Sequence, residues 1–207
     1  MTALRWPLRA LLALALWQII LRLWARAFPQ PIPPGWTWLL ENPWRRLYRL
    51  PERTAALCGL NPSDSVLELG CGSGLFTRAL RSRCTQLIAA DVSAHYLEIA
   101  RARVGALEGL GWLHTDGRSL ALEPDSVDAV VLLSVLTESA DPVGLLRECA
   151  RVLRPAGRIV VSEELFAPEY VPAHTLERWA RAAGLERVAK SGNAWVYFRH
   201  FRVAQGA

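Results

Sequence analysis

The chain of 207 residues is long enough for one α/β domain with a substantial core, and 52% of its residues are hydrophobic. Its net charge of +5 arises mainly from the first 40 residues, which hold four arginines and no acidic side chain. The rest of the chain carries 20 basic and 19 acidic residues, so the basic balance does not indicate a nucleic-acid-binding face. The four cysteines show no CxxC or CxxH spacing, which argues against a zinc site or a disulfide framework.

Residues 1–28 predict an apolar, membrane-associated helix. Arg9 and Arg22 bracket only 12 residues of its apolar part, about 18 Å of helix at about 1.5 Å per residue. A bilayer core of roughly 30 Å needs about 20 residues, so a transmembrane helix would require both arginines to snorkel. The helix would otherwise lie in the membrane interface. Two further interpretations stay open: a signal peptide with Ala25-Arg26-Ala27 as its cleavage site, or a helix packed on its own domain or a second copy.

Tryptophan strengthens the membrane interpretation, since six of nine tryptophans lie in the first 44 residues and this side chain favours the bilayer interface. The stretch from Pro29 to Gly35 cannot be helical, so residues 29–46 are predicted to form a Pro/Trp-rich linker before a domain at 47–207. We expect that domain on the cytosolic side, because more arginines follow the apolar segment than precede it. Those that follow are Arg22, Arg26, Arg45, Arg46 and Arg49.

The most informative stretch runs from Val66 to Gly74. After a predicted helix at Glu52–Leu60, Val66–Leu69 predict a short buried strand, and helical spacing resumes at Leu75–Leu80. The turn between them contains Gly70, Gly72 and Gly74. A strand, a glycine turn and a helix open a nucleotide-binding βαβ unit, in which glycine lets the backbone turn tightly and a ligand approach closely. Glu68 at the strand end would repel a pyrophosphate and would suit a cationic ligand.

An acidic residue follows the second predicted strand, and its spacing from the glycine turn indicates a role. Gln86–Ala90 form that strand, and Asp91 lies 21 residues after Gly70. This is close to the spacing at which a carboxylate accepts hydrogen bonds from both hydroxyls of a ribose. A helix at Ala94–Val104, capped by Ser93, and a third strand at Leu110–His114 follow.

The second half of the chain continues the alternation of strands and helices. Val127–Leu133 is a nearly continuous apolar run, typical of a strand buried on both faces. Asp141 and Pro142 begin a helix, and Arg154–Gly157 end it. The remaining predicted elements are a strand at Arg158–Ser162, a helix at Ala173–Ala183, and strands near Leu185–Val188 and Ala194–Val203 that would form a hairpin.

Three of these segments resemble motifs of class I S-adenosylmethionine-dependent methyltransferases. ELGCGSG resembles the first motif, Val127–Leu133 the fourth, and LRPAGRIVV the turn LKPGGxxxx, with Ala156 where glycine is usual. From about Leu47 to Val203 the chain is similar to the ubiquinone/menaquinone-biosynthesis type of small-molecule enzyme. The resemblance implies an α/β, Rossmann-like sheet that is mostly parallel with a C-terminal antiparallel hairpin, and S-adenosylmethionine as the cofactor. The implied cofactor-binding residues are Glu68, Gly70, Gly72, Gly74, Asp91, Asp116, which would accept from the adenine amino group, and Leu133.

The chemistry of the acceptor is less constrained. Methyl transfer from an activated sulfonium depends largely on positioning and desolvation, so a base is needed only where the nucleophile must lose a proton. Leu133–Leu136 lack the Asn-Pro-Pro-Tyr type motif, which disfavours amine methylation of DNA or glutamine. Thr137-Glu138 stands where many relatives carry His-Glu, so Glu138 and Glu163 are the candidate catalytic residues. A solvated or helix-capping acidic pair is the alternative for Glu163 and Glu164.

We therefore expect an enzyme that methylates a small, lipophilic or membrane-resident acceptor, such as a quinone precursor, a lipid headgroup or an isoprenoid. Two alternatives stay open: a non-catalytic module that keeps the fold and recruits a membrane partner, and a soluble methyltransferase with a self-packed N-terminal helix. No nucleic-acid partner is expected. The sequence specifies neither the methyl acceptor nor the oligomeric state.

Overall fold

The computed structural model of the protein describes residues 48–167 and 170–204, together with Leu16, Trp17, Ile19, Ile20, Leu23 and Arg45. Most of the predicted helix at 1–28 and of the linker at 29–46 lies outside these residues. Among the residues that are described, no helix is both long enough and apolar enough to cross a membrane.

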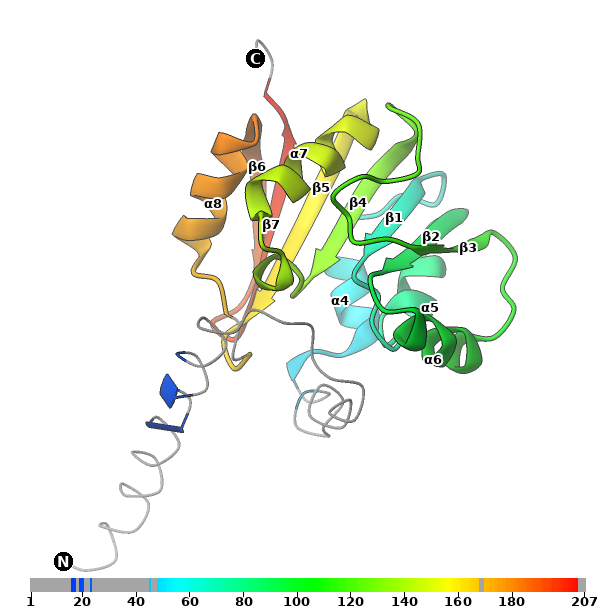
Figure 1. Cartoon of the computed structure of the whole chain (residues 1–207), viewed down its shortest axis with the longest axis horizontal. Coiled ribbons are helices and arrows are strands. Elements are labelled where there is room, and N and C mark those ends of the chain that lie inside the picture. The colour runs from blue at the N-terminus through cyan, green and yellow to red at the C-terminus, as the bar shows by residue number, and fades with distance from the viewer. Residues whose placement is uncertain are drawn as a thin grey trace, which may run out of the picture.

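The described domain alternates helices and strands along the chain (Figure 1). Its elements are α4 (Pro51–Leu57), β1 (Ser65–Leu69), α5 (Thr77–Arg81), β2 (Gln86–Asp91), α6 (Ala94–Val104), β3 (Leu110–His114), β4 (Val127–Leu133), the 3-10 turn η2 (Leu136–Glu138), α7 (Pro142–Val152), β5 (Leu153–Glu164), α8 (Ala173–Ala182), β6 (Leu185–Gly192) and β7 (Val196–Val203).

These strands form one seven-stranded sheet in the order β3-β2-β1-β4-β5-β7-β6. Strands β1 to β5 pair in parallel, whereas β7 is antiparallel to both β5 and β6. The α/β fold with a mostly parallel sheet and a C-terminal hairpin is therefore confirmed. Because β1 pairs with both β2 and β4, the chain reverses its direction across the sheet beside β1, which is where ligands bind in open α/β sheets.

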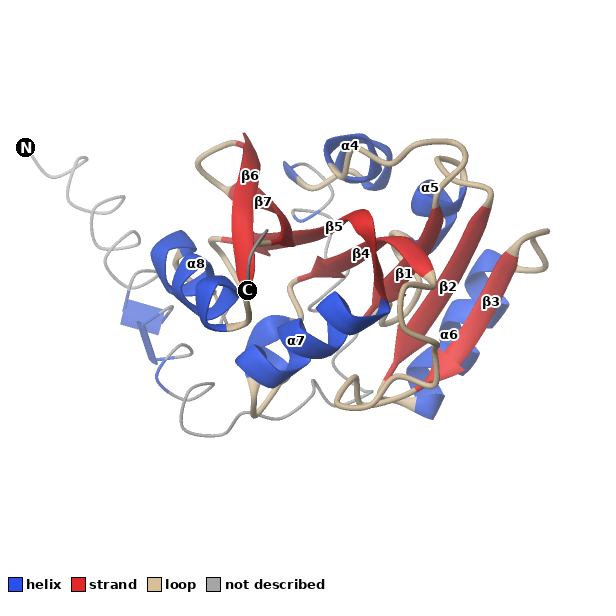
Figure 2. Ribbon diagram, turned by 90° about the horizontal axis from the view of Figure 1, so that it is seen from above, coloured by secondary structure: helices blue, strands red, loops and turns tan. Residues whose placement is uncertain are grey.

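Helices cover both faces of the sheet (Figure 2). Because successive side chains of a strand point to opposite faces of the sheet, each strand presents apolar side chains to the helices on both faces. On β1, Val66 packs in a cluster with residues of α4 and α5, whereas Leu67 packs in a second cluster with residues of α7 and α8. A smaller cluster joins α6 to the same face as α4 and α5 through Ala89 and Ala100.

Both predicted helix caps are confirmed. The Ser93 side chain accepts a hydrogen bond from the backbone N–H of Tyr96 at 3.3 Å, and helix α6 spans the predicted Ala94–Val104. The Asp141 Oδ1 accepts from the backbone N–H of Gly144 at 2.8 Å and begins α7, with Pro142 at its first position. Each cap satisfies a backbone donor that has no partner inside its helix.

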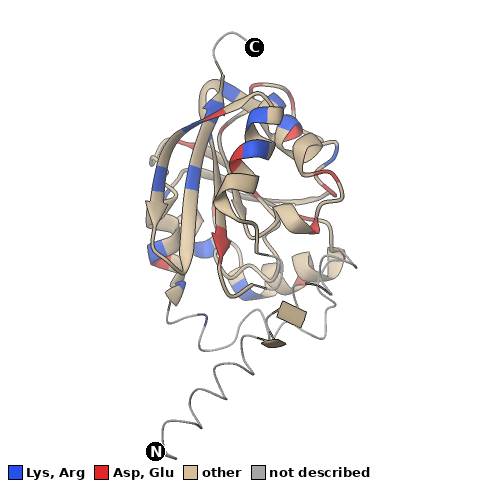
Figure 3. Cartoon of the chain, turned by 90° about the vertical axis from the view of Figure 1, so that its left-hand side faces the viewer, with Lys and Arg blue, Asp and Glu red and all other residues tan. Residues whose placement is uncertain are grey.

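Two predicted strand boundaries are wrong. Strand β5 begins at Leu153, not Arg158, because Leu153 pairs with Val127 of β4. The register shifts between Val127 and Ala129, so residues 154–157 also belong to the strand. Strand β6 extends to Gly192, beyond the predicted Val188, because backbone pairing with β7 continues although most β6 side chains are exposed. Charged side chains lie along β6 and β7 (Figure 3), which disfavours pairing of this edge with another sheet.

Candidate active site

The predicted site residues converge on one edge of the sheet, where the carboxyl ends of β1 to β5 meet. The glycine turn follows β1, Asp91 ends β2 and Leu133 ends β4. Glu163 is the second-to-last residue of β5. Asp116 follows β3 closely, and Glu138 ends η2. Parallel pairing alone brings these residues to one edge, since every strand from β1 to β5 runs the same way.

The three glycines of the turn have different physical roles, although all have positive φ values of 76°, 52° and 76°. A Cβ atom on Gly70 would collide with the Val135 side chain, and one on Gly74 would lie 3.0 Å from the Ala100 Cβ. Those two glycines therefore permit close packing within the domain. A Cβ atom on Gly72 would meet nothing within 4 Å, so the backbone there borders open space that a ligand can occupy.

Asp91 fixes this turn to the end of β2. Its Oδ2 accepts from the Gly72 N–H at 2.7 Å, and its Oδ1 accepts from the Ser93 N–H at 2.8 Å. The N–H groups of Gly70 and Cys71 donate to the carbonyl of Ala90 at 2.8 and 2.9 Å. Each carboxylate oxygen keeps a further acceptor site, so contact with a ribose stays a prediction that this geometry allows.

Glu68 lies beneath the glycine turn and is 2% exposed. Burial raises its pKa to about 8, with a smaller upward contribution from Asp91 and an opposing one from the Thr77 hydroxyl. Within the described part of the chain its Oε2 has no hydrogen-bond partner. A buried carboxyl with an unsatisfied oxygen gains most from a nearby cation, and this agrees with the predicted preference for a positively charged ligand. The open space at Gly72 and this oxygen both fit S-adenosylmethionine.

Cys71, inside the same turn, is buried, and burial raises the pKa of its thiol, followed in effect by Glu68 and Asp91. Since the thiolate is the reactive form, this cysteine packs and is a poor nucleophile.

The structure leaves the predicted roles of Asp116 and Leu133 without direct support. The exposed Asp116 accepts hydrogen bonds from the N–H of Arg118 at 3.0 Å and from its Nε at 2.8 Å, and these contacts lower its pKa. An adenine amino group would have to compete with Arg118 for the same oxygens. Leu133 is almost fully buried in the cluster shared with α4 and α5.

The two candidate catalytic carboxylates occupy different environments. Glu138 is half-buried in η2, and its N–H donates to the Val135 carbonyl at 3.0 Å. Glu163 is fully buried and pairs in register with Tyr197 of β7. Burial, followed by Glu163, raises the pKa of the Tyr197 hydroxyl. Because side chains alternate along β5, Glu163 and Glu164 point to opposite faces of the sheet. The prediction of a solvated acidic pair is wrong, since both side chains are buried.

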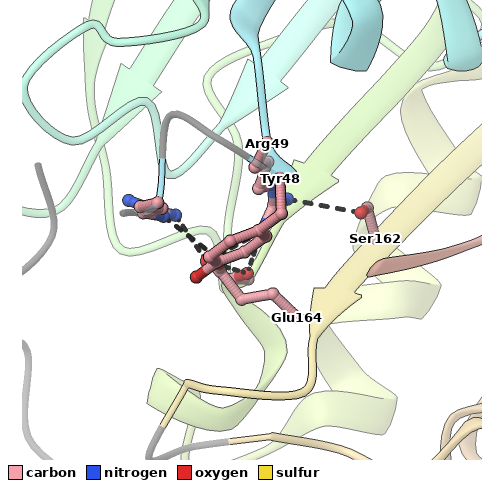
Figure 4. Close-up of polar contacts among 6 residues, drawn as sticks. Tyr48, Arg49, Ser162 and Glu164 are labelled. Atoms are coloured by element: carbon pink, nitrogen blue, oxygen red, sulfur yellow. Dashed lines mark hydrogen bonds and ion pairs between the residues drawn. The ribbon is translucent and has the colours of Figure 1, made fainter. Parts of the chain in front are cut away.

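Sequence analysis missed the most extensive polar cluster at this edge (Figure 4). Glu164 accepts from Arg45 Nε and Nη2 at 3.1 and 2.6 Å and from the Tyr48 hydroxyl at 3.0 Å, and it lies 2.8 Å from Arg49 Nη1. Burial alone would raise the pKa of Glu164, but Arg49 and Arg45 lower it to about 2. Both arginines were counted as basic residues flanking a membrane segment, whereas their side chains are ion-paired inside the domain. The i, i+4 spacing of Arg45 and Arg49, which puts both side chains on one face of a helix, was the one feature of the sequence that indicated a shared partner.

An exposed aromatic surface adjoins this cluster. Phe166, just after β5, stacks on Trp195 of the β6–β7 turn with ring centroids 5.1 Å apart, and the Tyr48 ring meets Phe166 edge-on at 5.7 Å. Phe166, Trp195 and nearby Leu50 are 45%, 48% and 48% exposed. We name Leu50, Phe166 and Trp195 the aromatic surface. It provides apolar area at the edge where the predicted site residues lie.

Comparison with known proteins agrees with this geometry. Residues 67–161 match the protein family described as "Methyltransferase domain". The chain is 31% identical over 127 residues to the demethylmenaquinone methyltransferase of Tropheryma whipplei, covering 61% of this chain and 50% of that protein. It is 31% identical over 130 residues to the ubiquinone biosynthesis O-methyltransferase of Parvibaculum lavamentivorans, covering 58% and 51%. The chain thus spans about half the length of these curated relatives.

The fold is similar to that of a SAM-dependent methyltransferase from Aquifex aeolicus, with a TM-score of 0.76 and 18% identity. That alignment covers 84% of this chain and all of the other. The likeness confirms the Rossmann-like methyltransferase fold that the sequence predicts.

The open space at Gly72 generates a first prediction. Gly72→Val should weaken binding of S-adenosylmethionine at least about tenfold, roughly 1.4 kcal/mol, because a branched side chain would fill the space next to the turn. Gly184→Val is the matched control, since Gly184 also has positive φ and open surroundings but lies between α8 and the start of β6, at the opposite edge of the sheet. Both variants should lose similar stability, about 1–2 kcal/mol, from the strained backbone. Titration calorimetry that finds equal affinities in the two variants would contradict the placement of the ligand.

Glu68 generates a pH prediction. Because burial raises its pKa from 4.5 to about 8, the folded protein holds a proton that the unfolded chain releases between these values. The free energy of unfolding should therefore fall as pH rises from about 4.5 to 8, by an amount on the order of a few kcal/mol. Glu68→Gln should raise the melting temperature of the ligand-free protein more at pH 9 than at pH 5. Equal shifts at both pH values in a thermal-denaturation scan would show that Glu68 does not titrate in this way.

Proposed function

We propose that this chain, a class I S-adenosylmethionine-dependent methyltransferase, transfers a methyl group to a small, lipophilic, quinone-like acceptor. The observation that carries the proposal is the open space at Gly72, flanked by the buried Glu68 and by Asp91, at the same edge of the sheet as an exposed aromatic surface. The first part suits a cationic nucleoside cofactor, and the second suits an apolar acceptor.

On this proposal, the backbone at Gly72 borders the methionine part of the cofactor and Asp91 accepts hydrogen bonds from its ribose. Asp116 would exchange its contact with Arg118 for the adenine amino group. Glu68 beneath the turn holds its proton near neutral pH, and the positive charge of the bound cofactor would favour its ionised form. When bound, S-adenosylmethionine supplies a methyl group already activated by the sulfonium, so these residues act mainly by holding and orienting it.

The acceptor must be nucleophilic at the atom that receives the methyl group. A quinone ring is electrophilic, whereas its reduced hydroquinone is electron-rich. Methyl transfer to a hydroxyl oxygen releases the proton of that hydroxyl, and transfer to a ring carbon releases the hydrogen of that carbon as a proton when the ring becomes aromatic again, so one proton must leave in either case. Glu138 and Glu163 are the proposed bases for that proton, because both lie at the carboxyl edge of the sheet, where we propose that the acceptor binds. The names of the similar proteins, which include demethylmenaquinone methyltransferase, support an acceptor of this class.

We further propose that residues 1–44 attach the protein to a membrane that holds the acceptor, with the domain on the cytosolic side. Leu16, Trp17, Ile19, Ile20 and Leu23 have helical backbone, and their side chains are 50–60% exposed. Large apolar side chains left in water are costly, so exposure of five of them favours burial in another medium. Two of the arginines assigned to membrane orientation, Arg45 and Arg49, belong to the Glu164 cluster, so the orientation rests on Arg22, Arg26 and Arg46.

Turnover tests the proposed activity. Full-length protein, S-adenosylmethionine labelled in its methyl group, and a reduced demethylmenaquinone in vesicles should yield a labelled, methylated hydroquinone. Phe166→Ala with Trp195→Ala should lower kcat/KM at least about tenfold for an acceptor with a long prenyl chain, by loss of roughly 1.4 kcal/mol of apolar contact. An acceptor without the chain should be affected less. Val188→Ala, which shortens a similarly exposed apolar side chain on β6, should leave kcat/KM unchanged for both acceptors.

No labelled product with either acceptor would contradict the proposed activity. Product that forms at equal rates in the aromatic variant and in Val188→Ala would leave methyl transfer standing but remove the role of the aromatic surface.

Fractionation tests the membrane proposal. Full-length protein should sediment with membranes and stay there in high salt, because burial of leucine and tryptophan is not screened by ions. Deletion of residues 1–40 should release a domain that still binds S-adenosylmethionine, since it keeps Arg45 and every predicted cofactor residue. Full-length protein that remains in the soluble fraction, or a truncated domain that unfolds, would favour a self-packed helix instead.

A further inference from the structure

The Arg49 side chain lies at the centre of the cluster drawn in Figure 4, and it is fully buried. Its Nη1 donates to Ser134 Oγ at 2.7 Å and pairs with Glu164 at 2.8 Å, and its Nη2 donates to Ser162 Oγ at 3.3 Å. One guanidinium thus joins the segment before α4 to the ends of both β4 and β5. A planar fork of donors can hold several acceptors in a fixed arrangement, which an ammonium group cannot do.

The same guanidinium also reaches the cofactor side of the edge. Arg49 lies over the Phe76 ring at 5.2 Å from its centroid, and Arg45 lies over the same ring at 5.7 Å. Phe76 is the N-cap residue of α5, two residues beyond Gly74. The cluster therefore contacts the glycine turn as well as the two strand ends.

Ser134 is the residue on which these contacts act. It follows β4 and has φ of 61°, a left-handed conformation that is unfavourable for a residue with a Cβ atom. Three contacts hold it there: its N–H donates to the Ser162 carbonyl at 2.8 Å, and its hydroxyl accepts from Arg49 and donates to Glu164 at 3.4 Å. Such strain persists only where the surroundings determine the conformation.

The strained turn has a direct consequence for the glycine turn. The next residue, Val135, occupies the space that a Cβ atom on Gly70 would need. After Val135 the chain enters η2, which carries Glu138. The direction in which the chain leaves β4 therefore sets both the contact with the glycine turn and the place of a proposed base.

We infer that Arg49, held by Glu164, is a positioning residue for methyl transfer, which fixes Ser134 and thereby seats the Ser134–Glu138 turn against the cofactor turn. Buried ion pairs are weak sources of net stability but can specify one arrangement of the groups around them. In the described chain the Nε of Arg49 has no hydrogen-bond partner, a further cost to stability. The kinetic part of this inference rests on the proposed function.

The two charges persist across the pH range of enzyme assays. Arg49 and Arg45 hold the pKa of Glu164 at about 2. Burial lowers the pKa of Arg49, against the opposing effects of Glu164 and Glu163, but a guanidinium keeps its proton throughout the pH range of enzyme assays. Arg45, Arg49 and Tyr48 face Glu164 from the segment before α4, and Ser134 faces it from the end of β4. The positioning should therefore be independent of pH between about 5 and 9.

The test compares Arg49→Met with Arg158→Met in the full-length protein. Arg158 pairs with Asp64 in a largely buried ion pair at the opposite edge of the sheet, so its loss should lower stability without touching the site. Arg49→Met should lower kcat at least tenfold with the short-chain reduced demethylmenaquinone, change the Kd for S-adenosylhomocysteine less than threefold, and speed amide hydrogen exchange at residues 134–139. Arg158→Met should leave kcat and the exchange of that segment within threefold of the wild type.

A second variant separates positioning from stability. Glycine adopts positive φ without strain, so adding Ser134→Gly to Arg49→Met should recover kcat at least threefold. Equal losses of kcat in Arg49→Met and Arg158→Met, or unchanged exchange at residues 134–139, would overturn the inference. If the wild type itself does not methylate the acceptor, the proposed function fails, while hydrogen exchange at residues 134–139 still decides whether Arg49 holds the turn.

Discussion

The burial of one carboxylate at the end of β5 organises the edge of the sheet at which we propose that the acceptor binds. Glu164 is almost fully buried, and a buried charge is tolerated only when it is paired and hydrogen-bonded. Arg45, Arg49 and Tyr48 meet that requirement, and to do so the segment before α4 must lie across the carboxyl edge of the sheet. Ion pairing, and not apolar packing alone, thus decides where the N-terminal part of the chain joins the domain.

Two buried glutamates at the same edge of the sheet show how the surroundings of a carboxyl group set its charge. Glu68 and Glu164 are both buried, but burial raises the pKa of Glu68 to about 8, whereas Arg49 and Arg45 outweigh burial at Glu164 and lower its pKa to about 2. The charge of Glu164 is therefore already balanced by the protein's own cations, whereas Glu68 remains a carboxyl that a cationic ligand can ionise.

Features that depend on neighbouring residues could be predicted from the sequence, and features that depend on distant ones could not. The Ser93 and Asp141 caps, the glycine turn and the strand that ends at Asp91 each fall within a few residues. In contrast, Arg45 and Glu164 are 119 residues apart, and nothing in the local pattern pairs them. The extension of β6 was missed for a related reason: its pairing is made by the backbone, while its exposed side chains carry no hydrophobic alternation.

The position of Arg45 connects the two proposals about the acceptor. Its side chain is fixed on Glu164, and Phe166 lies two residues further along the chain in the aromatic surface. The N-terminal 44 residues therefore join the domain at the edge that carries the aromatic surface, not at the opposite edge. If those residues enter a membrane, they tether the domain through Arg45 at this edge of the sheet and not at the opposite edge. A lipophilic acceptor could then reach the transfer site over apolar side chains, with little of its hydrocarbon exposed to water.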